Sequence, residues 1–376
     1  MNKTFRFLHR WLGLLSGLVV VIVAATGCLY AFADEIETAG MNHTGPKSSA
    51  PFLSPDSLAS LTRKQLADSG DSVASIVGVA YRRPGLSTRV TWMDAQGNRR
   101  TLMIDPHTGR VVGQLRGESF FRWVLRGHRS LWMPREIGSR VVGWATALFA
   151  VVLVSGLVLW VPRRWTKSSV AARLKVKWKT WRSRRLFDLH NTLGFYVALV
   201  ALIIAFTGLT WSFPPLARGY YRALTGKQMV EWSQPVSDTT HIDVRSDVGR
   251  QLWHRYRQLL PQQGDGSLRF DFPQDKEGVY MVALNPDGRR YGRQSYWFHD
   301  RYSGLQLVGG GSYALPPSAM NAGDKIFRAS YDIHSGSIGG MFGRVIVFVV
   351  SLIVATLPVT GFLMWWQRRH PRRPRR

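Results

Sequence analysis

The stretch His9-Arg10-Trp11-Leu12-Gly13 opens a long apolar segment that continues through Thr26-Gly27 to Phe32. The same arrangement returns in the second half of the chain, where His190-Asn191-Thr192-Leu193-Gly194 opens a segment through Thr207-Gly208 to Phe213. In both segments the Thr-Gly step lies 17 residues after the histidine. This repetition indicates that the chain contains two copies of one helical unit.

A second repeat lies at the ends of two further apolar segments. Ser155-Gly156-Leu157-Val158-Leu159-Trp160 corresponds to Thr360-Gly361-Phe362-Leu363-Met364-Trp365, and His128 and His334 precede these segments. Each copy of the unit therefore contributes a histidine near each end of its helices.

The mean hydropathy of −0.09 hides four apolar segments, about 11–33, 141–161, 193–213 and 343–366. Each has close to the ~20 residues with which a helix crosses a bilayer core. Backbone groups in lipid must bond internally, so these segments are predicted to be transmembrane helices.

The net charge of +27 is concentrated in three places: ten Lys or Arg within 163–185, six Arg after Trp366, and Lys3, Arg6 and Arg10. Basic flanks of this kind are typical of the cytoplasmic side. We expect cytoplasmic termini and a cytoplasmic middle loop, with two large extracytoplasmic loops. Tryptophans among the basic residues of the middle loop favour contact with anionic lipid over nucleic acid.

These observations predict an α+β membrane protein with four transmembrane helices in two parallel repeats. The predicted order is 1–10 (cytoplasmic), 11–33 (first helix), 34–140 (first outer domain), 141–161 (second helix), 162–189 (basic loop), 190–213 (third helix), 214–342 (second outer domain), 343–366 (fourth helix) and 367–376 (basic tail). The first apolar segment resembles a signal peptide, but its internal twin favours a retained helix.

Cys28 is the only cysteine, which excludes an intrachain disulfide and iron–sulfur ligation by four cysteines. In the outer segments, β-rich runs are predicted at 73–81, 87–93, 101–104, 268–272, 280–284 and 296–299. Helices are predicted to precede them, one starting at Ser54 and one over 244–260. The runs end in Asp105-Pro106-His107-Thr108-Gly109 and Asp300-Arg301-Tyr302-Ser303-Gly304, which we interpret as structural turns.

The helix–strand–strand–strand units that end in Asp-x-x-Ser/Thr-Gly resemble PepSY modules. The His-x-x-Leu-Gly helices and the Gly-x-x-x-Trp helices with trailing Arg pairs resemble PepSY-associated transmembrane proteins over the whole chain. Within these, the chain is most similar to the inner-membrane ferric-siderophore reductases of Gram-negative bacteria, the ferrioxamine reductase type. The resemblance implies a four-helix, di-haem oxidoreductase with a periplasmic substrate site.

The residues themselves lead to similar chemistry. If the two halves pack about an axis along the membrane normal, His9 faces His190 and His128 faces His334. Two facing imidazoles can hold one haem iron axially, so we expect two bis-His haem b groups that carry electrons. A histidine at an interface can instead serve as an anchor or a buried hydrogen-bonding group. Arg140 and Arg344 are candidates to pair with haem propionates, with interfacial snorkelling as the alternative.

The helix glycines have two possible roles at this point, approach of a macrocycle and close helix packing. The expected function is transfer of electrons across the membrane to a ferric siderophore in the periplasm, with release of Fe(II) for iron uptake. Quinol or a cytoplasmic reductase would donate the electrons. The alternatives are a haem-free membrane protein that binds a periplasmic protein or peptide, and a di-haem conduit to a separate periplasmic enzyme.

Overall fold

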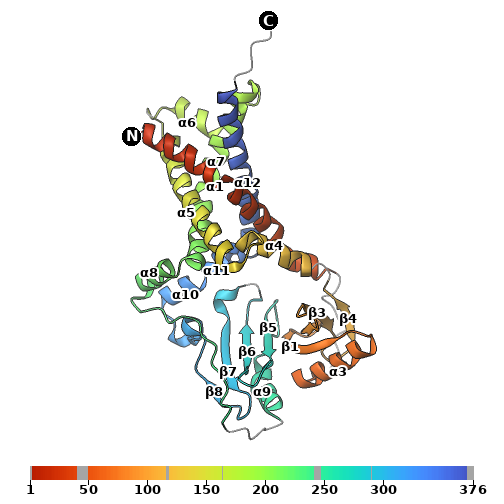
Figure 1. Cartoon of the computed structure of the whole chain (residues 1–376). Coiled ribbons are helices and arrows are strands. Elements are labelled where there is room, and N and C mark those ends of the chain that lie inside the picture. The colour runs from red at the N-terminus through yellow and green to blue at the C-terminus, as the bar shows by residue number, and fades with distance from the viewer. Residues whose placement is uncertain are drawn as a thin grey trace. The chain divides into compact units, whose positions relative to one another are not determined.

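The computed structural model describes residues 2–39, 50–115, 118–162, 164–240, 247–288 and 290–370. Part of the expected basic tail, 371–376, lies outside these residues, as does the start of the helix expected at 244–260. The chain divides into two compact units (Figure 1). The first comprises 1–33, 119–220 and 333–376, and the second comprises 34–118 and 221–332.

Four long helices build the first unit: α1 (Asn2–Tyr30), α5 (Arg135–Trp160), α7 (Arg182–Ser212) and α12 (Gly340–Arg369). All four are long and apolar enough to cross a membrane, which confirms the four predicted transmembrane helices. Helices α1 and α7 each pack against both α5 and α12. Small and aliphatic side chains meet in the centre of the bundle, among them Val20, Ala24, Leu153, Ala198, Ala201 and Val354.

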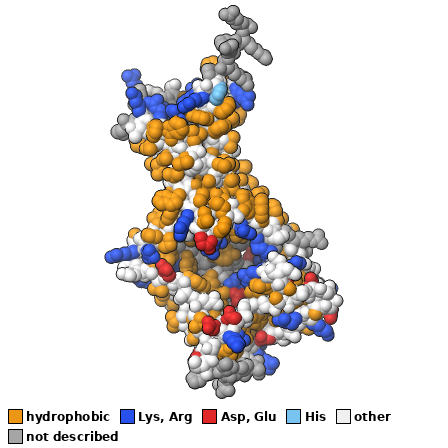
Figure 2. All heavy atoms as spheres, in the orientation of Figure 1, with side chains coloured by type: hydrophobic (Ala, Val, Ile, Leu, Met, Phe, Trp, Pro, Cys, Tyr) orange, Lys and Arg blue, Asp and Glu red, His pale blue; other side chains and the backbone are white. Residues whose placement is uncertain are grey.

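The face of this bundle seen in Figure 2 is apolar. Leu15, Leu18 and Leu199 are about 70% exposed, at 72%, 73% and 68%. Such a continuous apolar surface is unusual in a water-soluble protein but is what a helix presents to lipid. Shorter helices complete the two units: α2 (Ala33–Glu37), α4 (Glu118–Ser130), α6 (Lys167–Leu174), α8 (Pro214–Thr225), α10 (Ala322–Arg328) and α11 (Ser330–Ser335).

The second unit contains one antiparallel sheet of eight strands in the order β4-β3-β2-β1-β5-β6-β7-β8. The strands are β1 (Val73–Arg82), β2 (Thr88–Asp94), β3 (Arg99–Ile104), β4 (Val111–Gln114), β5 (Ser267–Asp271), β6 (Val279–Asn285), β7 (Ser295–Asp300) and β8 (Gln306–Leu307). Strands β1 to β4 come from the first expected outer domain and β5 to β8 from the second, and all eight share this sheet. Strand β1 pairs with β5, with Val79 opposite Phe270. The pairing removes an exposed strand edge from each module.

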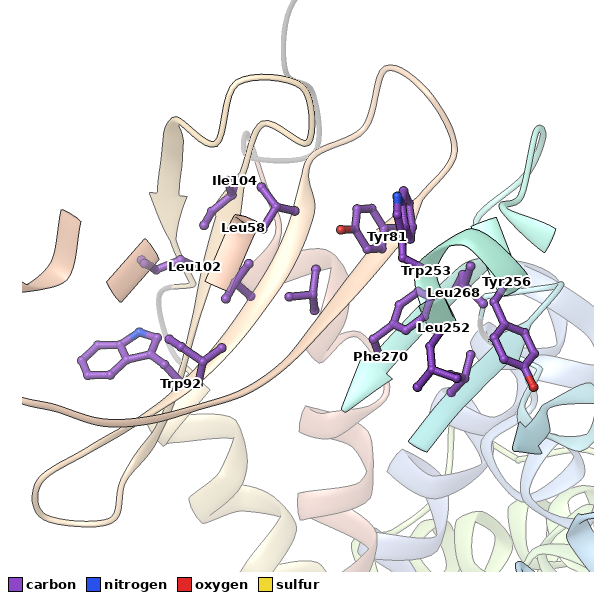
Figure 3. Packing of buried hydrophobic residues seen from close by; sticks show 14 of the residues in the cluster. Leu58, Tyr81, Trp92, Leu102, Ile104, Leu252, Trp253, Tyr256, Leu268 and Phe270 are labelled. Carbon is purple, nitrogen blue, oxygen red and sulfur yellow. The ribbon is translucent and has the colours of Figure 1, made fainter. Parts of the chain in front are cut away.

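Two helices cover one face of the sheet, α3 (Pro55–Asp68) and α9 (Val248–Tyr256). Ser54 caps α3 as predicted, because its hydroxyl accepts a hydrogen bond from the Ser57 amide at 3.2 Å. The core is continuous between the modules. Tyr81 of β1 stacks on Trp253 of α9 with 4.7 Å between ring centroids (Figure 3).

The Asp-x-x-Ser/Thr-Gly sequences form turns. Asp105 accepts a hydrogen bond from the His107 amide at 2.9 Å, and Asp300 accepts one from the Tyr302 amide at 2.9 Å. Gly109 and Gly304 adopt positive φ values of 74° and 72°. A positive φ favours glycine, which explains why glycine occupies these two positions. Both aspartates accept hydrogen bonds within their own turns, as expected for structural residues.

Candidate functional site

His9 and His190 face each other in the four-helix unit, and we call them the first pair. His9 lies in α1 and His190 in α7, near the start of each helix. Their ring centroids are 6.1 Å apart, and the ring planes meet at 88°. The geometry brings together the two residues that the first sequence repeat singled out.

His128 and His334 form a second pair with nearly the same geometry. His128 lies on α4 and His334 on α11, the short helices that precede α5 and α12. Their ring centroids are 6.2 Å apart, and the ring planes meet at 74°. Like the histidines of the first pair, both residues are half-buried.

Backbone carbonyls on a neighbouring helix hold one histidine of each pair. His9 donates from Nδ1 to the Val152 carbonyl of α5 at 3.0 Å, and the Ser155 hydroxyl lies 3.1 Å away. His128 donates from Nδ1 to the Val23 carbonyl of α1 at 2.9 Å. Val23 follows His9 by 14 residues in α1. At 1.5 Å per residue, the two pairs are therefore separated by about 20 Å along the bundle.

The Nδ1 atoms of the other two histidines, His190 and His334, lie close to threonine hydroxyl groups. Nδ1 of His190 lies 2.8 Å from Thr360 Oγ1 of α12. His334 Nδ1 lies 3.1 Å from Thr207 Oγ1 and 3.0 Å from the Ile204 carbonyl of α7. All four Nδ1 atoms thus engage a neighbouring helix. No hydrogen-bond partner of the four Nε2 atoms is found within the described residues, so each ring presents Nε2 as its free nitrogen.

Each of the four rings also lies against a glycine of that neighbouring helix. A Cβ added to Gly156, Gly27, Gly208 or Gly361 would lie 3.0, 3.2, 3.3 or 3.5 Å from Cε1 of His9, His128, His334 or His190, respectively. The sequence suggested two roles for the helix glycines, approach of a macrocycle and helix packing. These four glycines have a further role that the sequence did not suggest. They make room for the imidazole rings.

A local sequence pattern marks these four glycines, although the pattern alone does not reveal that they contact a histidine. Every ring-facing glycine follows a Ser or Thr. Three of these hydroxyls, those of Ser155, Thr207 and Thr360, contact the histidine. Other helix glycines do serve packing. A Cβ on Gly17 would lie 3.1 Å from Pro358, and one on Gly143 would lie 2.8 Å from Ser212.

The spacing of the imidazoles in both pairs fits two ligands of one haem iron. Bonds of about 2 Å from iron to each imidazole nitrogen place the two ring centres about 6 Å apart, the spacing found in both pairs. Ligation requires a neutral imidazole. Burial lowers the pKa of His128, and Arg129 lowers it further. Burial also lowers the pKa of His334 to about 4, with His128 contributing, so both rings of the second pair are neutral near pH 7.

The two candidate propionate partners lie in different environments. Arg140 of α5 is exposed. Arg344 of α12 is buried, donates to the Ala31 carbonyl and stacks over the Phe32 ring at 5.0 Å. Pairing of either arginine with a propionate stays a prediction, and Arg344 in addition holds the end of α1.

The remaining described histidines do not extend either site. No group of three His, Cys, Asp or Glu suited to a metal ion occurs in the part of the chain that the structure describes. His299 is fully buried in the second unit, between the Tyr256 hydroxyl at 2.9 Å and the Gly304 carbonyl at 3.0 Å. Its contacts are those of a structural residue.

Four lipid-facing helices joined to an α+β unit define an integral membrane protein. The model of the PepSY-associated TM region family matches residues 6–368, and the chain belongs to this family. A search of curated proteins finds no match.

Proposed function

We propose that this protein is a di-haem b-type inner-membrane reductase that moves electrons across the membrane to a ferric siderophore. One observation carries the proposal. In each pair, two imidazoles from different helices face each other at about 6 Å, and each is held through Nδ1 by a neighbouring helix. A pair that served only as a packing contact would not need the four Nε2 atoms to stay free.

The first pair would hold one haem and the second pair another. Held by both imidazoles of a pair, such a group would supply one-electron transfer and would leave no position for a further ligand. The chain orients the ligands through Nδ1, and glycine allows the ring to approach the neighbouring helix. Aliphatic side chains such as Leu153 and Val354 form the buried core of the bundle in which both sites would lie.

The proposed direction rests on charge. The basic middle loop and tail favour a cytoplasmic position for the termini and a periplasmic position for the second unit. Quinol or a cytoplasmic reductase would supply one electron at the first pair, and a ferric siderophore would accept it in the periplasm. Hard oxygen ligands hold Fe(III) more strongly than Fe(II), so one electron loosens the chelate and releases iron.

A visible spectrum of the purified protein, oxidised and reduced, tests the haem sites. We expect low-spin b-type bands in the wild type. The variants His9→Ala and His190→Ala should each lose the same haem, and His128→Ala and His334→Ala the other. His254→Ala is the matched control, because His254 lies outside both pairs. A washed wild-type protein without Soret absorbance would overturn the proposal and favour a haem-free binding protein.

The substrate needs a separate test. Dithionite-reduced protein, freed of excess reductant, is mixed with a ferric hydroxamate and with an Fe(II) trap. Oxidation of the haem bands together with trapped Fe(II) supports the reductase. Haem bands that stay reduced would contradict it and favour a conduit to a separate periplasmic enzyme.

A further inference from the structure

His190 differs from the other three paired histidines in how its Nδ1 is held. His9, His128 and His334 each have a backbone carbonyl within 3.0 Å as acceptor. Among the described residues, the close hydrogen-bond partner of His190 Nδ1 is the Thr360 hydroxyl, at 2.8 Å, and the Leu357 carbonyl is a secondary acceptor. Thr360 is therefore the main anchor of the His190 ring, whereas a backbone carbonyl is available at 3.0 Å or less to each of the other three histidines.

The hydrogen bonds of Thr360 define the direction of this contact. Its hydroxyl can donate to the carbonyls of Leu357 at 2.9 Å and Thr356 at 3.1 Å within α12. With its hydrogen committed there, Oγ1 accepts from Nδ1–H of His190, which leaves the lone pair on Nε2. The Thr360 hydroxyl thereby selects the tautomer that can bind a metal.

The sequence of α12 supplies a physical reason for the difference. In α5 and α7 the carbonyl three residues before the Ser or Thr, that of Val152 or Ile204, accepts from the histidine. The corresponding carbonyl of α12 belongs to Leu357, directly before Pro358, whereas α1, α5 and α7 contain no proline. Proline at 358 removes the helical hydrogen bond to the Val354 carbonyl and favours a bend in the turn that contains Leu357.

We propose that Thr360 is a positioning residue that orients the His190 ring and tunes its basicity as an axial ligand. The inference rests on the proposed haem function. A hydroxyl is a weaker acceptor than a carbonyl, so His190 donates less electron density than its partner His9. Loss of the hydroxyl leaves Nδ1–H without a well-placed acceptor, makes His190 a poorer donor still and favours the reduced iron.

The experiment uses full-length protein in nanodiscs. Thr360→Val keeps the shape of the side chain and removes the hydroxyl, and Thr360→Ser restores it. The matched control is Thr207→Val, because His334 retains the Ile204 carbonyl at 3.0 Å. Redox titration gives the midpoint potential of each haem, and electron paramagnetic resonance of the oxidised protein reports the angle between the imidazole planes. The His128→Ala variant, which retains only the first pair, assigns the signals.

In Thr360→Val we expect the potential of the first-pair haem to rise and its resonance to move away from that of near-perpendicular rings. The second-pair haem should stay unchanged and serve as the internal control for folding. Selective loss of the first-pair haem, restored in Thr360→Ser, also supports the proposal. Unchanged spectra in Thr360→Val, equal shifts in Thr360→Ser, or equal shifts in Thr207→Val would overturn it. Absence of haem from the wild type would instead overturn the proposed function itself.

Discussion

Gly156 of α5 lies directly against the imidazole ring of His9 of α1, with 3.0 Å between the position of an added Cβ and ring Cε1. The same relationship joins His128, His190 and His334 to Gly27, Gly361 and Gly208. Backbone without a side chain therefore forms one wall of every proposed ligand position. This arrangement couples helix packing to the orientation of the histidines.

Substitution of Gly156 by alanine should displace the His9 ring. The added methyl group is too close by a few tenths of an ångström, so we expect a cost of about 1–2 kcal/mol and lower occupancy of the first-pair haem. The control is Gly13→Ala, where the nearest atom is Val152 Cγ1 at 3.9 Å and where alanine favours the helix. Haem content and thermal stability are measured for both. Equal behaviour of the two variants would contradict the prediction.

Thr26 should behave differently from Thr360. Its hydroxyl donates within α1 to the carbonyls of Ile22 at 2.6 Å and Val23 at 3.0 Å, and no hydrogen bond to His128 is found among the described residues. We expect Thr26→Val to leave the potential of the second-pair haem unchanged. Redox titration beside Thr360→Val checks this, and a shift as large as in Thr360→Val would be evidence against the assigned contacts.

The shared core should couple the two sequence segments that form the sheet. Tyr81 of β1 and Trp253 of α9 stack with 4.7 Å between centroids and 28° between planes. A double-mutant cycle with Tyr81→Leu and Trp253→Leu should give a coupling free energy of about 0.5–1.5 kcal/mol. Denaturant unfolding of the second unit provides the measurement. Strictly additive effects would indicate that the two modules fold independently.

His299 should make the second unit less stable in acid. Burial lowers the pKa of His299, although its hydrogen bond to the Gly304 carbonyl opposes this shift. Nδ1 donates to Gly304, so Nε2 accepts from the Tyr256 hydroxyl, and protonation would break that contact. The unfolded chain then binds more protons than the folded chain below the ordinary histidine pKa of about 6.5. The contribution is complete above that pH and declines as pH falls below it.

Thermal unfolding between neutral pH and mild acid tests this sign for the wild type and for His299→Gln. Glutamine can replace both hydrogen bonds but does not titrate in this range. The variant should lose less stability than the wild type on acidification. Parallel decreases in both proteins would assign the acid sensitivity to other groups.

Much of the fold could be predicted because its signals are local. Apolar length predicted the four membrane helices, and alternation with turn residues predicted six of the eight strands. The pairing of β1 with β5 could not be predicted. Val79 and Phe270 are far apart in sequence, and the local pattern around each predicts a strand but not its partner strand. Pairing between distant strands depends on which edges the folded modules bring together.

For the candidate sites, the chain's own repetition determined which histidines correspond, because matched spacing on equivalent helices places matched residues at one depth. Only the tertiary structure decided how they are held. Whether the Nδ1 of His190 meets a hydroxyl and that of His128 a carbonyl depends on the packing of one helix against another. Those contacts depend on the side-chain volumes and backbone directions along the full length of both helices, so no local sequence pattern predicts them.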